Sequence, residues 1–188
     1  MNESNRYPVA QAIRERRTVR LFRPDPIDRT LLLELMETAC WTPNHGLREP
    51  WRFILYLGEA RRTFTEAVLA GLSAEEREKH GNSRAAYLDG IPVHLVVVMA
   101  EDPRQKQWVE DFGATSSWIQ SFQLAAWERG LGVVWKTNNY MYHPGFREAV
   151  GVRPGERVVG VLHVGYPETV PDPRPRTPPL DKLTIYEA

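Results

Sequence analysis

Apolar residues recur at helical spacing in five segments of the chain. The pattern predicts a short helix over 8–17 and a second helix that begins after Asp28, a suitable N-cap, and stops before Pro43. Further helices are predicted over 59–72, about 107–129 and 144–150. In the segment 107–129 the apolar residues cover more than one stripe, so we expect this helix to be buried all round, with another protomer as one partner.

Four segments have the composition of strands. Residues 51–57 are rich in aromatic and branched side chains, and 93–99 are almost continuously apolar, as in a strand covered on both faces. Shorter strands are predicted at 133–135 and 158–166. Helices and strands alternate with few βαβ signatures, which favours an α+β fold built as a three-layer α-β-α sandwich.

Two segments depart from these patterns. Residues 73–90 are charged and are interrupted by a Gly-Asn-Ser sequence at 81–83, which suggests a mobile surface segment or a lid. Residues 167–188 hold six prolines, so they cannot pair as a central strand and should form an extended, stiff arm. We therefore expect one domain over 1–188 that ends in a proline-rich C-terminal arm.

Composition narrows the classes of function. The chain of 188 residues carries 24 acidic and 24 basic residues, so no global charge draws it to nucleic acid or to anionic lipid. The N-terminus lacks the apolar run of a signal peptide, no segment is long and apolar enough to span a membrane, and Cys40 is the single cysteine. These features predict a soluble, cytoplasmic protein. Six tryptophans in so short a chain are expected to line a cavity or an interface.

Basic residues are concentrated in the segment 14–23, which holds five arginines and Thr18. They can be ordinary solvated charges near a helix C-terminus, where the helix dipole favours cations. Alternatively, guanidinium groups bind phosphate through paired hydrogen bonds, and a neighbouring hydroxyl and backbone amides complete such a site. Spacing alone leaves both interpretations open.

The loop 41–51 combines turn-forming residues with Trp41, His45 and Trp51 immediately before a predicted strand. A tight turn with a satisfied histidine is the commoner explanation of a lone imidazole. Two indoles that flank the imidazole also suit a flat heteroaromatic ligand, which needs stacking surfaces and hydrogen-bond donors in one place.

A Gly-x-Gly sequence at 130–132 resembles part of a dinucleotide-binding loop. It lacks the third glycine and precedes a strand instead of following one, so we expect these glycines to allow a sharp turn and a close backbone approach. Trp135, Lys136 and Thr137 lie at the end of that strand and can offer amides and side chains to a ring.

Metal and hydrolase chemistry have little support. The five histidines show no metal-binding spacing, so no metal site is predicted, and there is no Gly-x-Ser-x-Gly sequence. Cys40 and His45 are a conceivable nucleophilic pair, but Cys40 falls near the apolar side of its helix and is expected to be inert.

Taken in order, these segments resemble a known family. Arg16-Arg17-Thr18-Val19-Arg20-x-Phe22, then a helix, a loop that ends in Pro50-Trp51-Arg52-Phe53, and Gly130-x-Gly132 after a long buried helix are similar to the FMN-dependent nitroreductases, above all to their minimal members. The resemblance covers nearly the whole chain. It implies a homodimer with exchanged C-terminal arms, a mostly antiparallel or mixed central sheet, and two FMN sites between the protomers.

The same resemblance implies an activity. Family members take hydride from NADH or NADPH onto tightly but non-covalently bound FMN, and then reduce nitroaromatics, quinones or other small acceptors at the same site. Arg20 would face the N1/O2 edge of the flavin. Either Arg174 or Arg176 would reach the phosphate. The implied cofactor-binding residues are Arg16, Arg17, Thr18, Arg20, Trp41, His45, Trp135, Lys136, Thr137, Arg174 and Arg176.

The chain departs from the family's sequence pattern at one place, and two other functions remain as alternatives. Many family members read Asn-x-Gln-Pro-Trp where this chain has Leu47-Arg48-Glu49-Pro50-Trp51, and Glu49 is expected to pair with Arg48, Arg52 or a flavin-site arginine. A flavin-binding or flavin-modifying protein with little nicotinamide turnover is the main alternative. Nucleic-acid binding through 14–23 is disfavoured by the zero net charge.

Overall fold

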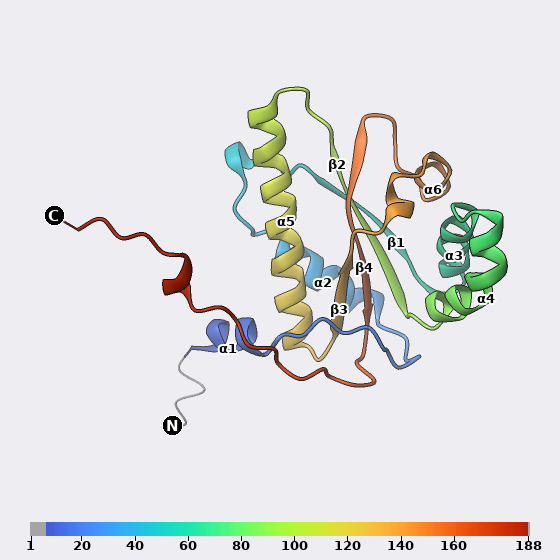
Figure 1. Cartoon of the computed structure of the whole chain (residues 1–188), viewed down its shortest axis with the longest axis horizontal. Helices are drawn as coiled ribbons and strands as arrows, with labels where there is room; N and C mark the ends of the chain where they lie inside the picture. Colours follow the sequence, from blue (N-terminus) through green and yellow to red (C-terminus); the bar gives the residue numbers. More distant parts are fainter. Residues whose placement is uncertain (1–6, 188) are drawn as a thin grey trace.

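A four-stranded sheet forms the middle of three layers in the computed structural model, which describes residues 7–187 (Figure 1). The strands are β1 (Trp51–Tyr56), β2 (Val93–Ala100), β3 (Gly132–Lys136) and β4 (Glu156–Gly165). Their order is β1-β2-β4-β3, and every neighbouring pair is antiparallel. The apolar strand β2 is central and buried along nearly its whole length, as its sequence predicts.

Helices cover both faces of this sheet, which confirms the α+β sandwich. On one face, α2 (Arg29–Ala39) and α5 (Gln105–Glu128) pack over one buried apolar cluster. On the other face, α3 (Arg61–Ala70), α4 (Ala74–Asp89) and α6 (Pro144–Ala149) enclose a second cluster. The short α1 (Pro8–Glu15) contacts α5. Asp28 is the N-cap of α2, because its Oδ1 accepts a hydrogen bond of 2.9 Å from the amide of Thr30.

The segment 73–90 is not interrupted at 81–83, because α4 occupies almost all of it, while its role as a mobile surface segment or a lid stays a prediction. A capping box starts the helix: the Ser73 hydroxyl accepts from the Glu76 amide, and the Glu76 carboxylate accepts from the Ser73 amide. Gly81 lies within the helix and is buried, so it does not break the helix. The Ser-x-x-Glu sequence was the local signal for this helix.

Within the described chain, helix α5 is buried on one side and exposed on another, so the expected burial all round would need a second protomer. Its buried residues follow one stripe, including Ala114, Trp118, Phe122 and Ala126, whereas Val109 on another side is 55% exposed. A partner protomer at the remaining face stays a prediction.

The C-terminal arm leaves the body of the molecule after β4. Residues 167–187 form no strand and hold a single short 3-10 turn, Pro179–Lys182, and the arm runs past α1 and away from the sheet (Figure 1). Leu180 and Tyr186 of the arm are 74% and 93% exposed. No helix among residues 7–187 is long and apolar enough to cross a membrane.

Candidate functional site

The arginine-bearing segment is fixed along the outer edge of the sheet. The amide of Val19 donates to the Val133 carbonyl at 3.3 Å, and the amide of Arg23 donates to the Tyr166 carbonyl at 2.9 Å. The Val19 side chain is fully buried. Because side chains alternate along extended backbone, Thr18 and Arg20 both point away from this buried side. The segment is thus held between β3 and the start of the arm, with its polar groups turned outward.

Glycines make this close approach possible, as the sequence analysis expected. Gly130 has a φ of 74°, a left-handed conformation that allows the sharp turn into β3. A Cβ at Gly132 would lie 2.5 Å from the Cβ of Val19, so only glycine lets the two backbones come this close. The Gly-x-Gly sequence therefore positions the segment 18–20.

A polar pocket of about 240 Å³ lies where this segment meets the arm. We call it the arginine pocket; it is lined by Arg17, Thr18, Arg20, Pro171, Asp172, Arg174 and Arg176. Five of the predicted site residues therefore come together. Both arm arginines line the pocket, so which of them reaches the phosphate stays open. Asp172 is the only carboxylate in the lining, and it makes no ion pair with the described residues.

Arg16 lies beside the pocket and is crowded by like charges. Its Nη1 donates to Oε1 of Gln123 on α5 at 3.3 Å. Burial lowers the pKa of the Arg16 guanidinium, and the charges of Arg17 and Arg176 lower it further. Arg17 is better satisfied, because its Nη1 donates to the carbonyls of Arg14 and Arg16 at 2.7 and 3.0 Å. A cluster of cations that repel one another is a suitable place for an anion.

The side chains at the end of β3, Trp135, Lys136 and Thr137, do not face a common cavity. The Trp135 indole packs against the cluster under α2 and α5, and its Nε1 donates to the Val159 carbonyl at 3.4 Å. Lys136 faces the opposite side of the sheet, as strand alternation requires. Thr137 lines a separate, larger cavity. The structure thus brings Lys136 and Thr137, but not the Trp135 side chain, toward open space.

Trp41 and His45 lie on the surface, away from the arginine pocket. Trp41 is 88% exposed, and His45 is exposed at the start of the 3-10 turn His45–Leu47. Neither residue lines any of the three cavities described here. Within one chain they have no role at the site; contact with a flavin of the partner protomer stays a prediction.

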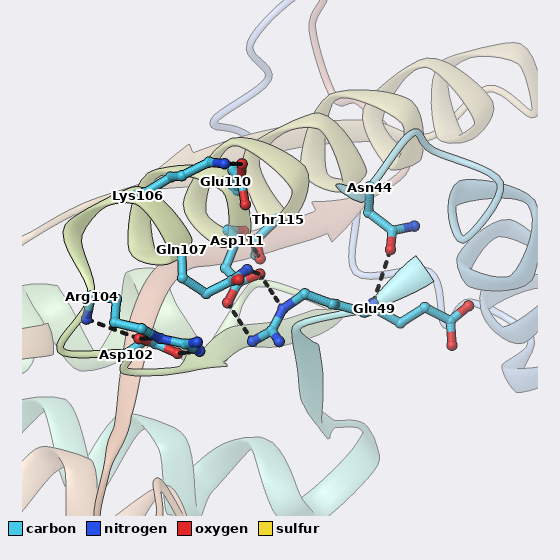
Figure 2. Close-up of polar contacts among 10 residues, drawn as sticks. Asn44, Glu49, Asp102, Arg104, Lys106, Gln107, Glu110, Asp111 and Thr115 are labelled. Carbon is cyan, nitrogen blue, oxygen red and sulfur yellow. Dashed lines mark hydrogen bonds and ion pairs between the residues drawn. The ribbon is translucent and has the colours of Figure 1, made fainter. Parts of the chain in front are cut away.

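The loop that carries these residues is strained and anchored. Gly46, Leu47 and Glu49 all have positive φ angles, of 62°, 51° and 45°. Between them, Arg48 donates from Nε and Nη2 to both oxygens of the buried Asp111, each at 3.1 Å. Gln107 donates to the same carboxylate, and Figure 2 shows that Gln107 and Asp111 both project from α5.

Glu49 takes none of the partners that the sequence suggested. Arg48 pairs with Asp111, and Arg52 pairs with Glu156. Glu49 contributes its backbone amide, which donates to Oδ1 of Asn44 at 3.0 Å, while its carboxylate points away from the Asp111 group in Figure 2. Glu49 makes no ion pair with a residue in the range 7–187.

Two further cavities lie on the α3–α4 side of the sheet. We call the smaller one, about 210 Å³, the tyrosine pocket; it is lined by Val68, Arg84, Tyr87, Leu88, Lys136, Asn138, Tyr140 and His163. The larger one, about 680 Å³, shares Arg84, Asn138 and Tyr140 with it, and we call it the outer cavity. Sequence analysis missed Arg84 and Tyr87, because their place in the pocket depends on how α4 packs over the sheet and no local motif marks it.

A pair of buried histidines lies behind the tyrosine pocket. Nδ1 of His94 and Nδ1 of His163 are 2.9 Å apart, so one ring donates to the other. Burial is the main cause that lowers the pKa of His94 to about 3, and burial also holds the pKa of His163 well below its usual range. Both rings are therefore neutral near neutral pH.

Metal and thiol chemistry gain no support from the geometry. The described residues contain no group of three or more metal-ligating side chains. Cys40 is half-buried, and its Sγ accepts a hydrogen bond of 3.4 Å from Nε1 of Trp118. This contact with a core indole fits the expectation of an inert thiol.

Known proteins with similar sequences and structures were then compared with this chain. A model of the nitroreductase family matches residues 13–166. YfhC of Bacillus subtilis, a protein named for NAD(P)H nitroreductase activity, is 37% identical over 177 residues, which cover 92% of this chain and 91% of YfhC.

Solved structures agree with this match. A nitroreductase-like family protein from Bacillus cereus superimposes with a TM-score of 0.93 at 46% identity, and the match covers 95% of this chain and 96% of that one. The FMN-dependent nitroreductase NfnB from Mycobacterium smegmatis, solved in complex with NADPH, shares the fold with a TM-score of 0.75 at 18% identity, over 98% of this chain and 100% of NfnB. The family model over residues 13–166 and the identity to YfhC over most of both chains show that this chain belongs to the nitroreductase family.

Proposed function

We propose that this protein is an FMN-dependent oxidoreductase that takes hydride from NADH or NADPH and reduces nitroaromatics, quinones or related small acceptors. The observation that carries the proposal is the arginine pocket, in which four guanidinium groups and the Thr18 hydroxyl face a single carboxylate. Such a pocket suits the phosphate of a nucleotide cofactor, because guanidinium groups bind phosphate oxygens with charge-assisted hydrogen bonds.

The residues present fit FMN at its phosphate end. Arg17, Thr18, Arg174 and Arg176 would hold the phosphate, with Arg16 beside them. Arg20 lines the same pocket, and Lys136 lies on the neighbouring strand end, where burial lowers the pKa of its ammonium and the charge of Arg20 lowers it further. Arg20 and Lys136 would therefore face the flavin ring of the nucleotide. When bound, FMN supplies the hydride chemistry, while the chain binds it, orients it and favours negative charge next to these cations.

We further propose that two copies of the chain form the complete site. Apolar side chains are exposed on three parts of the surface: Val9 and Ile13 on α1, Leu180 and Tyr186 on the arm, and Trp41 in the loop. Large exposed apolar groups at an extended arm indicate a surface that another chain covers. In the proposed homodimer the arms are exchanged, and the loop with Trp41 and His45 reaches the flavin of the partner protomer. Donor and acceptor would then bind alternately at one open site.

The absorbance spectrum of the purified protein tests this proposal. We expect a yellow protein that binds one FMN per chain, elutes as a dimer in size-exclusion chromatography, and loses its visible absorbance anaerobically when NADH or NADPH is added. A protein that takes up FMN but is reduced only very slowly by both nicotinamides would favour the flavin-binding alternative. A colourless protein that takes up no FMN would refute both.

A further inference from the structure

The tyrosine pocket lies next to the arginine pocket but is a separate cavity. It opens between α4 and the end of β3, with Arg84 and Tyr87 on the helix and Lys136 on the strand. Arg20, which lines the arginine pocket, acts electrostatically on both Tyr87 and Lys136. Arg20 therefore lies within electrostatic range of groups that line the tyrosine pocket.

The cations of the tyrosine pocket have no carboxylate partner. Neither Arg84 nor Lys136 forms an ion pair with a residue in the described part of the chain. Glu76 is an acid that acts electrostatically on Arg84, but its Oε2 accepts hydrogen bonds from the amide and the hydroxyl of Ser73 at 3.0 Å each. Arg84 and Lys136 thus face the cavity without a carboxylate paired directly to either of them among the described residues.

A buried hydroxyl adds a third donor. Oη of Tyr140 is buried and has no hydrogen-bond partner among the described residues. The Asn138 side chain lies near it, without the geometry of a hydrogen bond, and burial is the main cause that raises the pKa of Tyr140. Because buried polar groups normally have partners, this hydroxyl is expected to bond to a ligand or to water in the pocket.

The size and walls of the pocket indicate one aromatic ring. A cavity of about 150 Å³ accommodates benzene, and the tyrosine pocket measures about 210 Å³. Tyr87 and His163 form a wall, with their rings 6.4 Å apart and at 84° to each other, and Val68 and Leu88 add apolar contacts. A dinucleotide is much larger than this space, whereas a single ring with one charged substituent fits it.

We propose that the tyrosine pocket binds a carboxylated monocyclic arene, with the carboxylate at Arg84, Lys136 and the Tyr140 hydroxyl. Resting on the proposed function, this assigns a substrate class to the site: electron acceptors of the nitrobenzoate type. Neutral nitroarenes and quinones would gain the ring contacts but not the charge-assisted hydrogen bonds.

Binding of benzoate, which cannot be reduced, tests the pocket directly. Benzamide has nearly the same shape without the charge and serves as the reference ligand. By isothermal titration calorimetry with the FMN-loaded protein, we expect benzoate to bind about tenfold more tightly than benzamide, as one charge-assisted hydrogen bond at a partly exposed site would give. Arg84→Gln should abolish this difference, and Tyr140→Phe should reduce it. Arg77→Gln is the matched control, because Arg77 lies on the same helix but lines none of the three cavities.

Steady-state kinetics extend the test to acceptors. The ratio of kcat/KM for 4-nitrobenzoate to that for 4-nitrobenzamide should fall about tenfold in Arg84→Gln and stay unchanged in Arg77→Gln. Equal binding of benzoate and benzamide by the wild type would overturn the proposal. So would an Arg84→Gln variant that raises the KM for NADPH but not for NADH, because the pocket would then serve the phosphate of the donor.

The two proposals can fail separately. If the protein takes up no FMN, the proposed function is wrong, and benzoate binding by the FMN-free protein still tests the pocket. If Arg84→Gln weakens FMN binding and slows all acceptors equally, Arg84 serves the flavin and the acceptor subsite is refuted, while the proposed function stands.

Discussion

Replacing Arg16 by glutamine should change the stability of the free and the FMN-bound protein in opposite directions. In the free protein the Arg16 charge is partly buried and is repelled by Arg17 and Arg176, so its removal relieves an unfavourable interaction. The lost hydrogen bond to Gln123 is a long one, at 3.3 Å. We therefore expect Arg16→Gln to melt at the same temperature as the wild type, or slightly above it, when FMN is absent.

With FMN bound, the same substitution should be costly. A hydrogen bond between a charged group and phosphate contributes about 1.5–3 kcal/mol, and solvent screening at a half-exposed arginine places the loss near the lower end, about 2 kcal/mol. That loss corresponds to a roughly 30-fold weaker Kd for FMN. Under excess FMN the variant would lose about 2 kcal/mol of ligand-induced stabilisation, which for a chain of this length is about 4–8 °C in Tm.

Differential scanning fluorimetry with and without excess FMN measures both effects. Arg14→Gln is the matched control, since Arg14 lies on α1 and meets Arg17 through its backbone carbonyl, which the substitution leaves in place. The reasoning would be refuted if FMN raised the Tm of Arg16→Gln as much as that of the wild type. It would also be refuted if the free variant melted many degrees lower, because Arg16 would then be a structural residue.

Three further substitutions test the fold around the site. Gly132→Ala should lower the free energy of unfolding in urea by about 1–3 kcal/mol, because the new Cβ would press on buried Val19. Gly113→Ala is the control and should not lower it, because Gly113 has open space around it. Equal effects of the two substitutions would contradict the close approach of Gly132 and Val19. Arg52 holds the pKa of Glu156 below its usual range, so the ion pair stabilises the fold above the unfolded-state pKa of about 4.3 and loses this effect as pH falls through the folded-state pKa. Glu156→Gln should therefore lower the free energy of unfolding by about 1.5–3 kcal/mol near neutral pH and make it fall less steeply at acid pH. Equally steep falls at acid pH in the variant and the wild type would contradict the role of this ion pair. Because the pKa of His94 is lowered to about 3 in the folded protein, His94 is protonated at higher pH in the unfolded chain than in the folded one. The free energy of unfolding should therefore fall between about pH 6.5 and pH 3 by up to ~1.4 kcal/mol per pH unit. His94→Gln should reduce that slope, and an unchanged slope would show that His94 does not titrate in this way.

Local sequence patterns predicted the elements of the sheet well. The apolar run at 93–99 is a fully buried central strand, and the glycines at 130 and 132 have the roles of turn and close approach. These features depend on neighbouring residues and on backbone sterics, which are visible in a short window of sequence. The interruption at 81–83 was mispredicted because the charge of the segment 73–90 and Gly81 outweighed the capping signal at Ser73.

The site was harder to predict because it joins distant parts of the chain. Residues 17–20 and 171–176 meet only because the chain after β4 runs back along the segment 18–23. The resemblance to a known family supplied that pairing, and spacing did not. The tyrosine pocket depends on how α4 packs over the sheet, and no motif marks Arg84, Tyr87 or Tyr140.

The relative affinity for FMN and riboflavin tests the central claim most directly, because the two ligands differ only in the phosphate. If the arginine pocket binds that phosphate, the wild type should bind FMN at least about 100-fold more tightly than riboflavin in a fluorescence titration, and Arg16→Gln should narrow the gap. Equal affinities for the two flavins would contradict the account.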